Sequence, residues 1–144
     1  MCVIIDANQL GNFVNTDIAS SGMGRLREWI EKRGKIVYPN SGKYADEIRK
    51  HVKAKRKLEE YVRGGNAKIV DGKACENAAR EFDSHGINSN DAHILGLAKV
   101  SHATLLCTKD HDLKGDFKRL IRGGKIYPSS KKAQEKMLRE NTCR

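Results

Sequence analysis

Short apolar segments alternate along the chain with longer stretches in which apolar residues recur at helical spacing. The apolar segments have the length and character of buried strands, and they occupy residues 1–5, 35–38, 67–70, 103–107 and 125–127. The helical pattern occupies residues 23–34, 43–63, 72–85, 91–100 and 110–121. Strands that alternate with helices predict a parallel sheet covered by helices on both faces. We therefore expect an α/β fold.

Two of the predicted helices have distinctive patterns. Residues 43–63 form a long basic stretch that ends at Gly64-Gly65. Its rough apolar stripe comprises Tyr44, Ile48, Val52, Leu58, Tyr61 and Val62. Residues 91–100 are apolar on most faces and contain one glycine, which indicates tight packing in the centre of the fold.

The length of 144 residues is typical of one domain. We expect a folded domain over residues 1–128 and a polar tail over residues 129–144, as a docked or frayed helix. Apolar residues make up 38% of the chain and charged residues 32%, and the apolar runs are only as long as strands. We therefore expect neither a membrane span nor a signal peptide.

The cysteines are Cys2, Cys75, Cys107 and Cys143, and their spacing is not that of a zinc site. Cys2 and Cys107 fall in predicted strands, where a reduced cysteine packs as a small apolar residue. We therefore expect a cytoplasmic protein without disulfide bonds.

Several acidic residues stand where an α/β fold brings side chains together. Asp6 and Asp110 each follow a predicted buried strand, and the carboxyl ends of parallel strands meet at one edge of the sheet. Asp91 opens the apolar helix and Glu47 borders the apolar stripe of the basic helix, so both face the protein body. Each acid alone is also explained as a cap, a turn residue or a surface charge. Taken together, the four acids indicate a functional site at this edge of the sheet.

Two neighbouring acids are alternatives to members of this set. Asp46 precedes Glu47, and helical phase favours Glu47 only modestly. Asp112 follows Asp110 closely and competes with it as the last acid.

The acids belong to short motifs that cover nearly the whole chain in order. They are Asp6-Ala7-Asn8 after a strand, Glu47 in a mid-chain helix, Asn90-Asp91-Ala92 opening an apolar helix, and Thr108-Lys109-Asp110 after a strand. In order and spacing the set resembles the PIN-domain nucleases, a family that includes the VapC-type toxins of toxin–antitoxin pairs. The resemblance implies a three-layer α/β/α fold with a central, mostly parallel sheet. It also implies an acidic quartet of Asp6, Glu47, Asp91 and Asp110, supported by Asn8 and Thr108.

Crowded carboxylates repel one another unless a cation joins them, and Mg²⁺ or Mn²⁺ prefers oxygen ligands. The resemblance implies a metal-dependent endoribonuclease that hydrolyses RNA and leaves a 5′-phosphate and a 3′-hydroxyl. Asp6 and Asp91 are the expected direct ligands, with Asp110 beside them and Asp112 as the alternative. Glu47 would bind a second metal ion or orient the attacking water. The five histidines show no pair suited to attack by the RNA 2′-hydroxyl.

The formal net charge of +10 and the pI of about 9.6 favour a polyanionic partner. Lys43, Arg49, Lys50 and Lys109 lie near the acids in sequence, and we expect them to contact RNA phosphates. A solvated surface explains the same residues without RNA.

The resemblance also implies an antitoxin protein that covers the acidic site, and small nucleases of this kind often form homodimers. Two alternatives stay open. One is a PIN-like module that binds RNA or protein without cutting it, and the other is a DNA-directed nuclease of the same chemistry.

Overall fold

The computed structural model of the protein describes residues 2–15 and 21–141. In this part of the chain one sheet is formed by β1 (Val3–Ile5), β2 (Ile36–Pro39), β3 (Ala67–Val70), β4 (Leu105–Cys107) and β5 (Lys125–Ile126). The strand order is β3-β2-β1-β4-β5, and every pairing is parallel. The predicted strands and the predicted parallel sheet are therefore confirmed. The order reverses at β1, which lies between β2 and β4.

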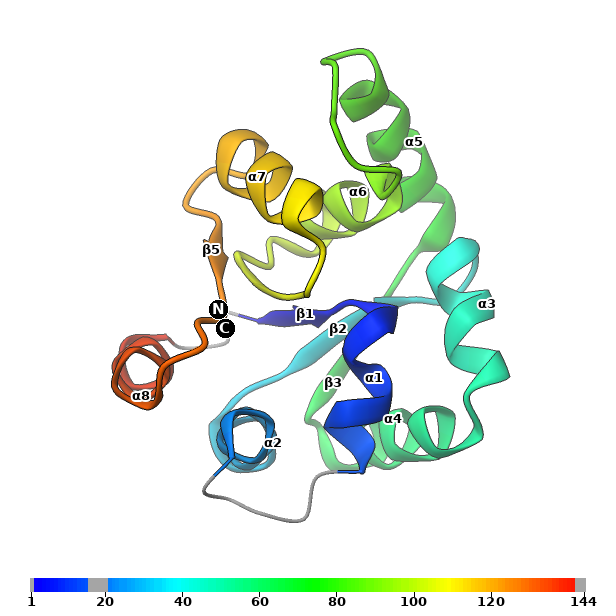
Figure 1. Cartoon of the computed structure of the whole chain (residues 1–144). Coiled ribbons are helices and arrows are strands. Elements are labelled where there is room, and N and C mark those ends of the chain that lie inside the picture. The colour runs from blue at the N-terminus through cyan, green and yellow to red at the C-terminus, as the bar shows by residue number, and fades with distance from the viewer. Residues whose placement is uncertain (1, 16–20, 142–144) are drawn as a thin grey trace.

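Helices cover both faces of the sheet, so the fold has three layers (Figure 1). On one face lie α5 (Gly72–Asp83), α6 (Ala92–Ser101) and α7 (His111–Leu120), and on the other lie α1 (Ala7–Val14), α2 (Gly22–Arg33) and α4 (Val52–Gly64). Helix α3 (Lys43–Lys50) stands near the end of β1, and α8 (Lys131–Glu140) packs against α2. The core between the layers includes the fully buried Ile4, Ile5, Phe13, Ile94 and Leu106.

Two features of the helices differ from the sequence prediction. Helix α1 begins directly after Asp6, where the sequence predicted no helix. The predicted helix over residues 43–63 is two helices, which meet at His51. His51 has an extended backbone (φ −107°, ψ 93°), and its Nδ1 accepts a hydrogen bond from the amide of Ala54, which caps α4.

The break at His51 changes which residues of this segment are buried. In one continuous helix, Val52 would lie on the same face as Tyr44 and Ile48. Instead Val52 is 63% exposed, and Ala54 takes the buried position. The second helix is thereby free to run along the sheet, while α3 stays at the end of β1 (Figure 1).

Helices α5 and α6 approach each other closely at Gly96. A Cβ added there would lie 2.3 Å from the carbonyl oxygen of Cys75, well inside any real contact distance. Only glycine permits this approach, so the tight packing predicted for residues 91–100 is confirmed. The approach fixes the position of α6, and with it the position of Asp91, which directly precedes the helix.

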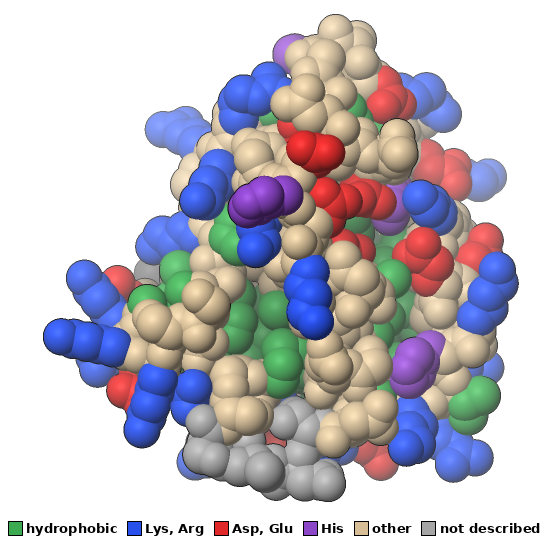
Figure 2. Space-filling view, in the orientation of Figure 1, with side chains coloured by type: hydrophobic (Ala, Val, Ile, Leu, Met, Phe, Trp, Pro, Cys, Tyr) green, Lys and Arg blue, Asp and Glu red, His purple; other side chains and the backbone are tan. Residues whose placement is uncertain are grey.

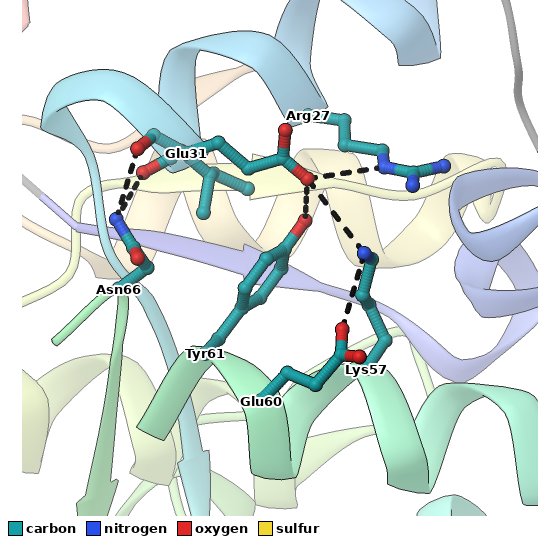
Figure 3. Close-up of polar contacts among 7 residues, drawn as sticks. Arg27, Glu31, Lys57, Glu60, Tyr61 and Asn66 are labelled. Atoms are coloured by element: carbon teal, nitrogen blue, oxygen red, sulfur yellow. Dashed lines mark hydrogen bonds and ion pairs between the residues drawn. The ribbon is translucent and has the colours of Figure 1, made fainter. Parts of the chain in front are cut away.

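A polar network joins α2 to α4 on the face opposite α6 (Figure 3). The carboxylate oxygen Oε1 of Glu31 accepts hydrogen bonds from Tyr61 (2.8 Å) and Arg27 (3.3 Å), and the ammonium of Lys57 lies 3.9 Å away. The side chain of Asn66, just before β3, donates to the carbonyl of Ile30 (2.9 Å). These contacts tie the helical layer together away from the acidic residues.

The C-terminal segment is folded onto the rest of the protein. Ser130 caps α8 by accepting a hydrogen bond from the amide of Ala133, and Leu138 of this helix is buried in the core. The segment that follows Pro128 is thus a docked helix as far as Glu140.

Cys2 is disulfide-bonded, so the expectation of a protein without disulfide bonds is wrong at this residue. Spacing along the chain does not show which distant cysteines approach each other in space, and that approach decides whether a disulfide forms. Cys75 and Cys107 are free and buried. No helix among the described residues is long and apolar enough to cross a membrane.

Candidate active site

Asp6 and the Thr108–Asp110 segment lie side by side because β1 and β4 are neighbours. Ile5 and Cys107 are paired in register, and the amide of Asp6 donates a hydrogen bond to the carbonyl of Cys107 (2.9 Å). Both strands end here, at the point where the strand order reverses. In open α/β sheets, this is where ligand sites form.

The hydroxyl of Thr108 connects the two strand ends. It donates a hydrogen bond to Oδ2 of Asp6 (2.7 Å) and accepts one from the amide of Asp110 (3.1 Å). The side-chain amide of Asn8 also donates to it (3.4 Å). Thr108 is buried, as is Asp6, which is only 6% exposed. The hydroxyl therefore fixes the orientation of the Asp6 carboxylate.

Helix α3 brings Glu47 to the same place. The hydroxyl of Tyr44, which is buried, donates a hydrogen bond to the carbonyl of Ile5 and so anchors α3 to the end of β1. Glu47 lies one turn further along α3 and interacts electrostatically with Asp6. Asp46 is exposed and forms an ion pair with Arg49. Of the two neighbouring acids, Glu47 is the one whose charge is coupled to that of Asp6.

Asp91 reaches the cluster from the other helical layer. It stands just before α6, and its side chain makes no capping hydrogen bond to that helix. Its Oδ1 lies 4.0 Å from the ammonium of Lys43 and 3.9 Å from Nδ1 of His93. The Nε2 atom of His93 is buried without a hydrogen-bond partner in the described part of the chain. Burial, followed by the positive charge of Lys43, lowers the pKa of His93 to about 4, so its ring is neutral near pH 7.

The charges of these acids act on one another. Burial, followed by the negative charge of Asp6, raises the pKa of Asp91 to about 6, and Asp110 adds to the rise. Burial also raises the pKa of Asp6, although hydrogen bonds from Thr108 and Ala7 oppose this, and the charge of Asp110 contributes to the rise. Burial again is the main cause of the raised pKa of Glu47, to which Asp6 adds. Asp6 is thus the acid to which the other three are coupled.

Among the described residues, Lys43 is the one cation whose charge acts on three of these acids. Its charge opposes the rise in pKa at Asp6, Glu47 and Asp91. Lys50 acts on Glu47 in the same direction. Arg49, by contrast, is engaged with Asp46 and with the carbonyl of Asn40.

Asp110 and Asp112 have different surroundings. Asp110 caps α7, because its Oδ1 accepts hydrogen bonds from the amides of Asp112 (2.9 Å) and Leu113 (3.1 Å). Asp110 is also among the charges that raise the pKa of Asp6 and Asp91. Asp112 is exposed in the first turn of α7. Asp110, rather than Asp112, is therefore the acid of this segment whose charge acts on Asp6 and Asp91.

Acidic side chains gather near the middle of the face shown in Figure 2, over the region where α7 begins and β1 ends in Figure 1. Their oxygen atoms are hard donors of the kind that Mg²⁺ and Mn²⁺ prefer. Burial and the charges of the neighbouring acids raise the pKa values of Asp6, Glu47 and Asp91. Within the described residues, however, no three acidic, histidine or cysteine side chains stand close enough together to form a finished metal site. The donor chemistry fits a divalent ion, and the present side-chain positions leave the carboxylates apart.

Sequence reasoning did not single out Asp116, which supports this site. Asp116 of α7 is fully buried, and its carboxylate accepts hydrogen bonds from the amides of Asn88 and Ser89 in the loop that leads to Asp91. The only signal in the sequence is its place on the inner face of α7, next to Leu113 and Phe117 in helical phase.

Comparison with known families agrees with this architecture. The family model of the PIN domain matches residues 3–119, which include the whole acidic cluster. The chain therefore belongs to the PIN-domain family, a family of nuclease-type domains that typically use divalent metal ions such as Mg²⁺. No curated protein and no solved structure gives a significant match to the chain.

Proposed function

We propose that this protein is a metal-dependent endoribonuclease whose active site is formed by Asp6, Glu47, Asp91 and Asp110. The observation that carries the proposal is the coupling of Asp6 to acids from three other elements of the fold. Buried carboxylates that raise one another's pKa destabilise a fold, so such a cluster is more often functional than structural.

Asp6, Asp91 and Asp110 would hold Mg²⁺ or Mn²⁺, with Glu47 at a second ion or at the attacking water. The bound ion supplies an activated water and neutralises charge on the phosphate. Thr108 keeps Asp6 in one orientation, and Tyr44 keeps α3, which carries Glu47, against the end of β1. The positive charge of Lys43 partly neutralises the negative charge of the acids, and its ammonium group would contact a substrate phosphate.

The net charge of +10 supports a nucleic-acid substrate. Lys43, Lys50 and Lys109 border the acids and would contact the RNA backbone, whereas Arg49 is already paired with Asp46. His93, the histidine beside Asp91, has a depressed pKa and would not act as a general acid near pH 7. Hydrolysis by water would leave a 5′-phosphate and a 3′-hydroxyl, rather than a cyclic phosphate.

The same chemistry suits the toxin of a toxin–antitoxin pair, in which a partner protein covers the acidic site. The resemblance to VapC-type toxins supports this role, and a dimer would be consistent with it. Expression of the chain alone should then arrest growth and alter the RNA of the host, while Asp6→Asn should not. Normal growth with intact RNA would count against a toxin, and would leave the nuclease chemistry to be judged separately.

Product analysis tests the reaction. End-labelled single-stranded RNA is incubated with the protein in Mg²⁺, Mn²⁺ or EDTA, beside a DNA strand of the same sequence. We expect metal-dependent cutting of RNA and products that accept a label at the 3′-hydroxyl without prior phosphatase treatment. Cyclic phosphate ends, or equal cutting in EDTA, would contradict the proposed chemistry. Preferential cutting of the DNA strand would contradict RNA as the substrate.

A further inference from the structure

A cavity of about 470 Å³ lies beside the acidic cluster, between the start of α7 and the segment that follows β5. Thr108, the residue that holds Asp6, lines this cavity as well. We call it the lateral groove and define it by Met23, Thr108, Lys109, Lys114, Lys118 and Tyr127. The side chain of Thr108 therefore links the lateral groove to the Asp6 carboxylate.

One wall of the lateral groove is cationic. Lys114 and Lys118 stand one turn apart on α7, and Lys109 precedes the helix. In the described part of the chain none of the three forms an ion pair with an acid, and the groove has no acidic residue in its lining. Lys32, Lys57 and Lys99, by contrast, are each paired with a glutamate. The charge of this wall is therefore available to a partner.

The groove and the cluster also meet at Cys107. Burial, followed by the negative charge of Asp6, raises the pKa of Cys107 to about 12, while the positive charge of Lys114 acts in the opposite direction. Cys107 lines the lateral groove, and its carbonyl accepts a hydrogen bond from the amide of Asp6 (2.9 Å). Figure 2 shows the corresponding surface: hydrophobic side chains lie beside the acidic group, with Lys and Arg side chains around them.

The opposite wall is held in place by the C-terminal segment. Gln134 of α8 donates a hydrogen bond to the carbonyl of Pro128 (2.8 Å) and accepts hydrogen bonds from Arg25 (2.7 and 3.0 Å). The hydroxyl of Tyr127 donates to the carbonyl of Gly22. This wall is preformed, and it lies beyond residue 119, where the match to the family model ends.

From this arrangement we propose that the lateral groove binds the phosphate backbone of a single RNA strand next to the bond that is cut. The unpaired lysines match the regular negative charge of the backbone, and the half-buried Tyr127 and Met23 offer an apolar floor to a base. The segment from Tyr127 to Gln134 thereby becomes part of substrate binding rather than a tail. The proposal rests on the nuclease function proposed above, but binding is measurable without cleavage.

The test compares two charge-matched pairs of substitutions. Lys114→Gln with Lys118→Gln removes charge from the groove, and Lys68→Gln with Lys73→Gln removes the same charge from exposed residues of β3 and α5, at the other edge of the sheet. Both pairs are made in an Asp6→Asn background, and binding of a fluorescent single-stranded RNA is followed by anisotropy in EDTA over a range of salt. Lys109 is left unchanged because it adjoins Asp110.

We expect the variant with Lys114→Gln and Lys118→Gln to bind the RNA roughly 10- to 30-fold more weakly at 0.1 M salt. The slope of the logarithm of its binding constant against the logarithm of the salt concentration should become shallower by about 1.4, as expected for two lost backbone contacts. The control pair should differ from the parent by less than about threefold. Equal losses in both pairs, or no loss in the groove pair, would overturn the proposal. So would an absence of RNA binding by the parent, or equally effective competition by a polyglutamate peptide of matched charge.

The outcomes for the groove and for the enzyme are separable. RNA binding that depends on Lys114 and Lys118, without cleavage by the wild-type chain in any metal, would support the groove and contradict the nuclease. Metal-dependent cleavage with unaltered binding by the groove pair would support the nuclease and contradict the groove.

Discussion

The carboxylate of Asp116 accepts a hydrogen bond from the amide of Ser89 at 2.8 Å, and so ties α7 to the loop that leads into Asp91. The amide of Asn88 donates to the same carboxylate at 3.1 Å. Arg119 reinforces the connection, because it contacts both Asp116 (3.3 Å) and the carbonyl of Gly86 (3.2 Å). Asp110 caps α7 and Asp91 follows the loop, so this connection sets the positions of two acids of the cluster at once.

Asp116→Asn should therefore destabilise the protein and weaken catalysis together. An asparagine turns a donor group toward backbone amides that need an acceptor, which should cost about 2 kcal/mol of unfolding free energy. Denaturant unfolding measures this, with the exposed Asp112→Asn on the same helix as the control. An unchanged unfolding midpoint in Asp116→Asn would show that the loop is held by other contacts.

The stabilising effect of Asp116 should also depend on pH. Burial on its own raises the pKa of Asp116, but the hydrogen bonds from Ser89, Asn88 and Arg119 outweigh it and hold the pKa below its usual range. The ionised carboxylate thus stabilises the fold above the ordinary pKa of an aspartate, and this contribution is lost as pH falls through the lower pKa of the folded state. The unfolding free energy of Asp116→Asn should therefore fall less steeply with decreasing pH than that of the wild-type protein, as denaturant unfolding at several acidic pH values measures.

Asp91 should change the dependence of stability on pH in the opposite direction to Asp116. Its pKa of about 6 lies above the ordinary value of 3.8, so the folded state binds a proton more tightly than the unfolded state. Without divalent ions, stability should fall as pH rises from about 4 to about 6, and Asp91→Asn should gain about 1–2 kcal/mol at pH 7.5, after allowance for partial solvation. Unfolding in EDTA and in Mg²⁺ measures this. If Asp91→Asn were less stable than the wild-type protein in EDTA, the carboxylate of Asp91 would not be electrostatically unfavourable in the fold.

Thr108→Val tests the contribution of the Thr108 hydroxyl, because valine keeps the shape of the side chain and lacks the hydroxyl. Valine leaves the buried oxygen of Asp6 and the amide of Asp110 without their partner, which should cost about 1–2 kcal/mol of unfolding free energy and reduce cleavage. Thr108→Ser keeps the hydroxyl and should retain most of the activity. If valine and serine reduced kcat equally, the orientation of Asp6 would not depend on this hydrogen bond.

Gly96→Ala tests the contact that positions α6. The new Cβ would lie 2.3 Å from a backbone oxygen of α5, so the two helices must separate, at a cost of about 2–4 kcal/mol in unfolding free energy. Gly115→Ala on α7 is the control, because a Cβ there meets nothing, and it should be neutral or slightly stabilising. Similar thermal unfolding for both variants would mean that the helices can part without cost.

The sheet could be predicted from the sequence because its strands are short apolar runs separated by helical patterns. The positions of Asp6 and Asp110 followed from the same reasoning, since each acid closely follows a buried strand. Helix α1 was missed because it is short and its sequence is rich in asparagine, with a glycine at position 11. Its buried Leu10 and Phe13 were the available signal.

Other features depend on contacts that a local pattern does not show. The break at His51 is fixed by its side chain, which caps α4. Helical periodicity alone predicted one continuous helix over residues 43–63. The role of Asp116 depends on a loop nearly thirty positions away along the chain. The disulfide at Cys2 likewise reflects an approach in space rather than a spacing in sequence.

The central claim is that Asp6 and the acids coupled to it hydrolyse RNA with the help of a divalent ion. The most direct measurement is cleavage of end-labelled single-stranded RNA in Mg²⁺, Mn²⁺ and EDTA by the wild-type chain, by Asp6→Asn and by the exposed control Asp46→Asn. We expect the wild-type chain and Asp46→Asn to cut only with metal, and Asp6→Asn to be folded but slower by a factor of at least about 100. Cutting by Asp6→Asn at the wild-type rate, or undiminished cutting in EDTA, would contradict the claim.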